Sequence, residues 1–87
     1  MKVQNMTNSN GNTVPNQFII HDNAGFTYFQ SYDTVIIRKC ASLTELDKDY
    51  WDYSRTTNKY RNLFLGETTK EIKSKINSGE YKLTSLN

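Results

Sequence analysis

The stretch Asp49–Arg61 constrains the fold of this chain more than any other segment. Its first part, Tyr50–Tyr53, has the aromatic, period-two pattern of a strand. Its second part begins with Ser54, a residue type that helix N-caps prefer, and continues in a helical pattern. We therefore expect the chain to pass from a sheet to helices at this point, which predicts an α+β fold.

The residues before this stretch predict an antiparallel sheet. Gln17–Asp22 and Phe26–Ser31 are rich in β-forming residues, and the three residues between them end in a glycine, which is typical of a β-hairpin. Thr34–Cys40 begins with four β-branched residues and predicts a central strand. Met1–Thr7 alternates weakly and predicts an edge strand.

Two segments are expected to be connections. Asn8–Asn16 contains mainly turn-forming residues and predicts a loop. In Ala41–Lys48, the residues Ser42–Glu45 match a helix capping box, but the segment is equally compatible with a plain loop. We interpret it as a loop with at most one helical turn.

Two helices are expected in the C-terminal half. Ser54 or Thr56 caps the first, which ends near Leu65 because Gly66 supplies a left-handed stop. The second, predicted from a capping box at Thr68–Glu71, runs over Thr69–Ser78.

The expected architecture is therefore a small antiparallel sheet of four or five strands, with two C-terminal helices packed on one face. After the second helix, Tyr81–Leu86 alternates loosely and could return as a short strand. With 87 residues the chain has room for one core only, so residues 1–87 are expected to form a single domain.

Composition narrows the class of protein. The hydrophobic content of 36% and the aromatic content of 13% are too high for a disordered chain. Cys40 is the only cysteine, which excludes an intrachain disulfide and favours a reducing compartment. No signal peptide and no run of eighteen apolar residues is present. We expect a cytoplasmic protein without membrane contact.

Catalytic and metal-binding patterns are not found. The only pair that could provide a nucleophile and a base is Cys40 with His21, and no third activating group is recognisable. One cysteine, one histidine and scattered carboxylates do not match zinc-ligand spacings. We expect neither an enzyme nor a cofactor or metal.

The stretch around Trp51 interleaves aromatic rings and cations, a combination that suits single-stranded nucleic acid and protein hot spots alike. Trp51 and Tyr60 are expected to belong mainly to the core. The remaining residues are expected to be exposed and to form the partner-binding surface: Tyr53, Arg55, Lys59 and Arg61.

The charge is too small and too mixed to decide between these partners. The net charge is +2, and residues 48–87 carry eight cations against five anions. A solvated surface explains this mild bias better than a nucleic-acid face does. A mimic of DNA is excluded, because it would have to be strongly acidic.

The residues Tyr50–Gly66 resemble a family of short uncharacterised proteins found in phages, prophages and plasmids of Gram-positive bacteria. These proteins share a WDYS-x-TT-x-K-Y/H-x-x-x-F core that follows a YFQSYD/N stretch, which here is Tyr28–Asp33. This chain departs from the pattern at Cys40–Lys48, where the family has a plain turn.

The resemblance implies a small accessory protein of a phage or mobile element that acts by stoichiometric binding. Such proteins often disable a host machine, so we expect an anti-CRISPR-like inhibitor whose partner is a host protein or ribonucleoprotein complex, a Cas nuclease in particular. The alternative is a nucleic-acid-binding module of phage replication or gene control. A third interpretation is a protein that dimerises through its exposed aromatics, and the sequence leaves both a monomer and a homodimer open.

Overall fold

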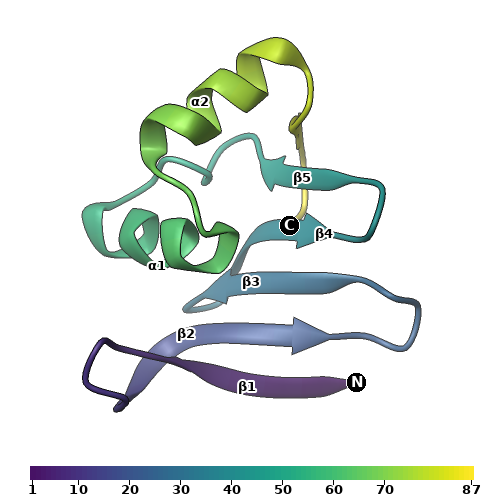
Figure 1. Cartoon of the computed structure of the whole chain (residues 1–87). Coiled ribbons are helices and arrows are strands. Elements are labelled where there is room, and N and C mark those ends of the chain that lie inside the picture. The colour runs from purple at the N-terminus through teal and green to yellow at the C-terminus, as the bar shows by residue number, and fades with distance from the viewer.

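The computed structural model describes residues 1–87 and contains one sheet and two helices (Figure 1). The strands are β1 (Lys2–Thr7), β2 (Thr13–His21), β3 (Thr27–Ser31), β4 (Thr34–Lys39), β5 (Thr44–Asp47) and β6 (Lys82–Thr84). The helices are α1 (Arg55–Leu65) and α2 (Thr69–Ser78), and both lie on the same side of the sheet.

The strand order in the sheet is the order in the chain. Strands β1 to β5 form an antiparallel meander, and β6 pairs with β5 in parallel. The α+β class is confirmed, and so are β1 as an edge strand and β4 as a central one. The expectation of four or five antiparallel strands was wrong, because the helical connection between β5 and β6 returns the chain to the same end of the sheet and makes the sixth strand parallel.

The segment expected to be a loop before Trp51 contains strand β5. The capping-box pattern Ser42–Glu45 does not start a helix, because Thr44–Asp47 pairs with β4 on one side and with β6 on the other. Leu46 at the centre of this strand is fully buried. Pairing on two sides and burial therefore override the local helix signal.

Tyr50–Tyr53, expected to be a strand, lies in the turn between β5 and α1. The cause is Asp47, whose Oδ2 accepts hydrogen bonds from the backbone N–H groups of Asp49 and Tyr50, both at 3.0 Å. These bonds bend the chain immediately after β5, as aspartate side chains commonly do in turns.

The predicted loop Asn8–Asn16 is shorter than expected. Asn8 Oδ1 accepts hydrogen bonds from the N–H groups of Asn10 and Asn12, which closes the turn. Strand β2 then begins at Thr13 rather than at the predicted Gln17, and Thr13 pairs with Thr7 of β1.

Both helices have the predicted ends. Ser54 caps α1 by accepting a hydrogen bond from the Thr57 N–H, and Gly66 ends it with a φ of 68°. The capping box of α2 is complete, with Thr68 and Glu71 bonding each other's backbone. The capping residues and C-terminal glycines in the sequence therefore determine where both helices begin and end.

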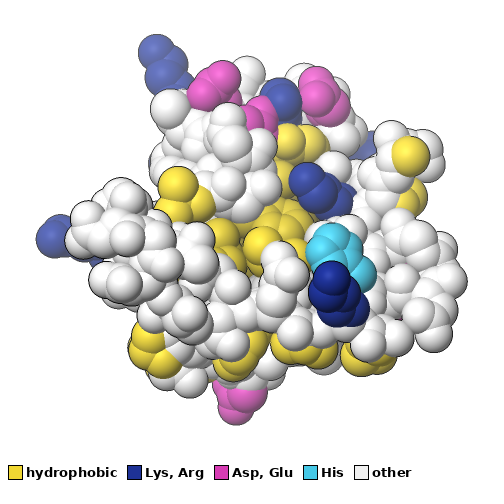
Figure 2. Space-filling model, turned by 60° about the horizontal axis from the view of Figure 1, so that its bottom comes forward, with side chains coloured by type: hydrophobic (Ala, Val, Ile, Leu, Met, Phe, Trp, Pro, Cys, Tyr) yellow, Lys and Arg dark blue, Asp and Glu magenta, His cyan; other side chains and the backbone are white.

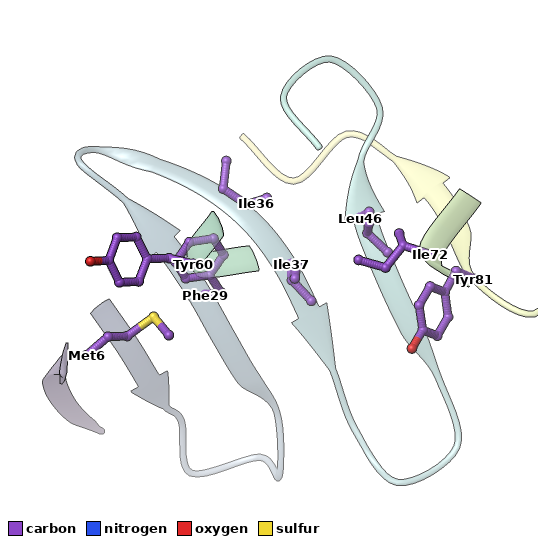
Figure 3. Packing of buried hydrophobic residues seen from close by; sticks show 8 residues of the cluster. All are labelled: Met6, Phe29, Ile36, Ile37, Leu46, Tyr60, Ile72 and Tyr81. Atoms are coloured by element: carbon purple, nitrogen blue, oxygen red, sulfur yellow. The ribbon is translucent and has the colours of Figure 1, made fainter. Parts of the chain in front are cut away.

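The core lies between the sheet and the helices (Figure 3). Met6, Phe29 and Tyr60 lie together at one end of the cluster, and Leu46, Ile72 and Tyr81 lie at the other. The two groups are joined by side chains of β4, and Phe64 of α1 stacks on Phe29 with ring centroids 5.8 Å apart. The junction between β5 and α1 is thus attached to a packed framework, and this junction carries the candidate site.

Candidate partner-binding site

The predicted site residues lie around an open hollow at the start of α1, with a volume of about 580 Å³. Three of the four line it directly, namely Tyr53, Arg55 and Lys59. The other lining residues are polar: Asp52, Ser54, Asn58, Asn62 and Thr69. The structure therefore brings most of the predicted residues to one surface.

Arg61 is the exception. The expectation that this side chain is exposed was wrong, because its exposed fraction is 0%. Arg61 falls on the buried stripe of α1 together with Thr57, Tyr60 and Phe64, at the spacing of one helix face. That spacing is a sequence signal that could have placed Arg61 inside.

The buried guanidinium of Arg61 joins three segments. It donates to the Trp51 carbonyl oxygen at 2.5 Å and to Thr69 Oγ1 at 2.9 Å, and therefore connects the turn before α1 with the first residue of α2. It also donates to the side-chain oxygens of Asn58 and Asn62. Arg61 thus lies beneath the hollow and holds its walls together.

The charge of Arg61 is only weakly balanced. The nearest carboxylate is that of the half-exposed Asp52, at 4.0 Å. Burial lowers the pKa of Arg61 from its usual range, and the Asp52 charge partly offsets this shift. Because an arginine stays protonated in proteins, its charge adds to those of Arg55 and Lys59, and the hollow is positive despite Asp52.

The aromatic residues of the stretch divide as expected between core and surface. Tyr60 is buried, and the half-buried Trp51 packs against the core and lies under the Arg61 guanidinium, 5.4 Å from the ring centroid. Tyr53 is 65% exposed and meets Tyr50 edge to face, with centroids 5.3 Å apart. Tyr53 is therefore the aromatic group that the hollow offers to a partner.

The polar wall of the hollow was not predicted. Arg55, Asn58, Lys59 and Asn62 share one face of α1 at spacings of three and four residues, so helical periodicity could have identified the two asparagines. No sequence signal points to Thr69, because it reaches the hollow from α2.

The pair considered for nucleophilic chemistry is not assembled. Cys40 Sγ has Ser42 Oγ as its neighbour at 3.7 Å, and His21 Nδ1 bonds Thr27 Oγ1 at 3.2 Å. The backbone and side-chain hydrogen bonds of Ser42 lower the pKa of the Cys40 thiol, but no base is bonded to it. The residues that could ligate a metal do not gather in groups of three or more.

The surface charge is mixed. Figure 2 views the molecule from the side of β1 and shows positive and negative side chains interspersed along its upper rim, with hydrophobic side chains in the middle.

Neither helix has the length and apolar composition that a bilayer crossing requires.

Comparison with known proteins gives one finding about identity. Neither the curated proteins nor the solved structures contain a match to this chain. A family model described as "Family of unknown function (DUF8033)" matches residues 1–80, which is nearly the whole chain. The protein therefore belongs to the DUF8033 family.

Proposed function

We propose that this protein acts by stoichiometric binding to a macromolecular partner, and that the hollow bordered by Tyr53, Arg55 and Lys59 is its contact surface. The observation that carries this proposal is the exposure of these three side chains on one surface, beside a junction that Trp51, Tyr60 and Arg61 attach to the core. Exposed tyrosine and arginine are the residue types that dominate protein–protein hot spots.

A protein surface suits the hollow better than bare nucleic acid does. Binding of single strands needs several stacking platforms along a cationic groove. Trp51 and Tyr60 are engaged in the core, and Asp52 places a carboxylate among the cations. A mixed lining of this kind matches an acidic or mixed protein surface, where charge complementarity sets the orientation of the partner.

The proposed target is a Cas effector of a CRISPR defence system in the cytoplasm of a host cell, and the protein is an inhibitor of that effector. The target class rests on the resemblance of Tyr50–Gly66 and Tyr28–Asp33 to short proteins of phages and plasmids. In this proposal Arg61 is a positioning residue, because it fixes the turn from which Tyr53 projects.

The test is a size-exclusion binding assay. Purified Cas nucleases loaded with guide RNA are mixed with the protein, and a stable one-to-one complex is expected with at least one effector. The variant Y53A/R55A/K59A should fail to co-elute. The variant K70A/K73A is the matched control, because it also removes two exposed cations but lies on α2 outside the hollow.

Two outcomes contradict the proposal. If the triple variant co-elutes as well as the wild type, the hollow is not the contact surface. If no effector binds but labelled single-stranded oligonucleotides do, with an affinity that falls steeply with salt, the protein is a nucleic-acid-binding module.

A further inference from the structure

A second, more enclosed cleft lies on the other side of Tyr53, at the turn between β3 and β4, with a volume of about 240 Å³. Tyr32, Asp33 and Tyr53 line it together with residues of its floor, which are Ser31, Thr34, Ile36 and Thr57. Ser31 Oγ and Thr57 Oγ1 bond each other at 2.9 Å, so the floor is internally satisfied.

Tyr32 holds an unfavourable backbone conformation at this cleft. Its φ is 58°, in the left-handed region that favours glycine at the tight turn of a hairpin. The Tyr32 N–H donates to the Asn16 carbonyl oxygen at 2.6 Å, and Asn16 also has a positive φ of 67°. The hairpin turn requires this conformation but does not require a tyrosine, and residues with such backbone strain are frequent at functional sites.

Burial does not offset this strain. The Tyr32 side chain is 59% exposed, so packing in the core gives no reason for a tyrosine at this position. Tyr53 is also exposed, and the two rings border the same cleft. The arrangement therefore presents two tyrosine rings to a ligand from outside the chain.

Asp33 determines the charge of that ligand. Its carboxylate forms no ion pair in this chain, and its one side-chain hydrogen bond is a long one of 3.4 Å from Thr34 Oγ1. An unpaired carboxylate beside tyrosine rings repels phosphate and attracts a cation, which the ring faces also stabilise. A planar guanidinium can stack on a ring and bond a carboxylate at the same time.

We propose that the cleft between Tyr32 and Tyr53 binds the guanidinium of an arginine on a protein partner, with Asp33 as its counter-ion. The partner surface then places an acidic group over the basic hollow and an arginine in the adjacent cleft, with Tyr53 between them. The biological role of the cleft rests on the proposed function, whereas the binding of a guanidinium is tested without any partner.

The experiment is an NMR titration of the ¹⁵N-labelled protein with N-acetyl-arginine amide. Saturable shifts are expected at the amides of Ser31–Thr34, Tyr53 and Thr57, with a dissociation constant on the order of millimolar for a single side chain. N-acetyl-citrulline amide, which has nearly the same shape without the charge, should cause no saturable shift at these amides.

Two variants separate binding from folding. Tyr32→Gly suits the positive φ, so the thermal midpoint should not fall, while arginine binding weakens about fivefold or more. Asp33→Asn keeps the size of the side chain and should weaken binding about two- to fivefold. Shifts that are absent, that occur equally with citrulline, or that persist unchanged in both variants overturn the proposal. These results leave the size-exclusion test of the hollow unaffected.

Discussion

Arg61 is a fully buried arginine without a close carboxylate, and its partners are neutral oxygens of the β5–α1 turn, α1 and α2. A buried cation is tolerated only where its N–H groups are satisfied. In this protein the N–H groups donate hydrogen bonds to oxygens of four residues. The guanidinium also lies over the ring of Trp51. The side chain therefore has a structural role that a surface residue of the same type does not have.

We predict that Arg61→Ala lowers the free energy of unfolding by about 2–4 kcal/mol, because several buried acceptors lose their donor. Arg61→Lys should also destabilise the protein, since an ammonium group cannot reproduce the planar arrangement of N–H donors in the guanidinium. Urea denaturation measures both effects. The exposed Arg55→Ala is the control and should stay within about 0.5 kcal/mol of the wild type. A similarly small effect of Arg61→Ala would show that the network is not needed.

Asp47 is the second buried charged residue that organises the chain. Besides the two turn N–H groups, its Oδ1 accepts from the Leu86 N–H at 2.8 Å and from Asn87 Nδ2 at 3.1 Å. Asn87 in turn bonds both backbone groups of Val35. Asp47 thus fastens the residues after β6 to the sheet and bends the chain toward the candidate site.

The pKa of Asp47 gives a pH-dependent prediction. Burial alone would raise the pKa of this carboxyl, but the hydrogen bonds from Leu86, Asp49, Asn87 and Tyr50 outweigh it and hold the pKa below its usual range. The stabilisation is therefore complete above pH values near 4 and is lost as the pH falls through the lowered pKa.

Asp47→Asn should destabilise the protein at pH 7 by on the order of 2 kcal/mol, because an amide cannot accept all four bonds. The difference from the wild type should shrink as the pH falls below about 4 and through the lowered pKa, because the folded wild-type carboxyl then becomes protonated as well. Unfolding free energies between about pH 7 and pH 2.5 check this, and a difference that does not change with pH would contradict the assignment.

At the scale of elements, the ends of the helices are fixed by local chemistry. In the capping box of α2, the Glu71 N–H donates to Thr68 Oγ1 at 3.2 Å, and Glu71 Oε1 accepts from the Thr68 N–H at 3.0 Å. Hydrogen bonding from Thr68 to the Glu71 carboxylate also lowers the pKa of Glu71. The start of α2 matters for the site because Thr69 lines the hollow.

We predict that Thr68→Ala lowers the free energy of unfolding by about 1 kcal/mol, the usual effect of removing an N-cap side chain. Thr56→Ala, at an exposed position near the start of α1, is the control and should be neutral or slightly stabilising. Thermal unfolding followed by circular dichroism measures both variants. Equal midpoints for Thr68→Ala and the wild type would show that the cap is dispensable.

The elements that the sequence predicted are those with local causes. Gly66 and Gly79 end the helices, the β-branched run from Thr34 forms β4, and the glycine-containing turn closes the β2–β3 hairpin. The missed strand β5 has a non-local cause, because its neighbours β4 and β6 come from both sides of it in the chain. No local pattern could have overridden the capping-box signal at Ser42–Glu45.

In the candidate site, too, the features with local causes could be predicted and those with non-local causes could not. The exposure of Tyr53, Arg55 and Lys59 follows from the polar side of α1 and the turn before it, and it was predictable. Arg61 was placed wrongly because its charge was weighed above its position on the helix. Its bond to the Trp51 carbonyl spans ten residues, and this contact depends on the turn that Asp47 imposes.

At the scale of the whole molecule, the net charge is only +2, and the lining of the hollow holds the carboxylate of Asp52 beside the cations Arg55 and Lys59. We therefore predict that fluorescence anisotropy detects no binding of labelled single- or double-stranded oligonucleotides at micromolar protein and 150 mM salt. Tight binding that weakens with salt and is lost in R55A/K59A would contradict this prediction.

The proposed function, inhibition of a Cas effector by stoichiometric binding through the hollow, is tested most directly by a DNA-cleavage titration. The protein is titrated into a guide-loaded Cas nuclease that it binds, and target cleavage is measured. We predict that cleavage stops near one protein per effector, that Y53A/R55A/K59A leaves it intact, and that K70A/K73A inhibits as the wild type does. Undiminished cleavage at a large excess of protein, or equal inhibition by the triple variant, would contradict the proposed function.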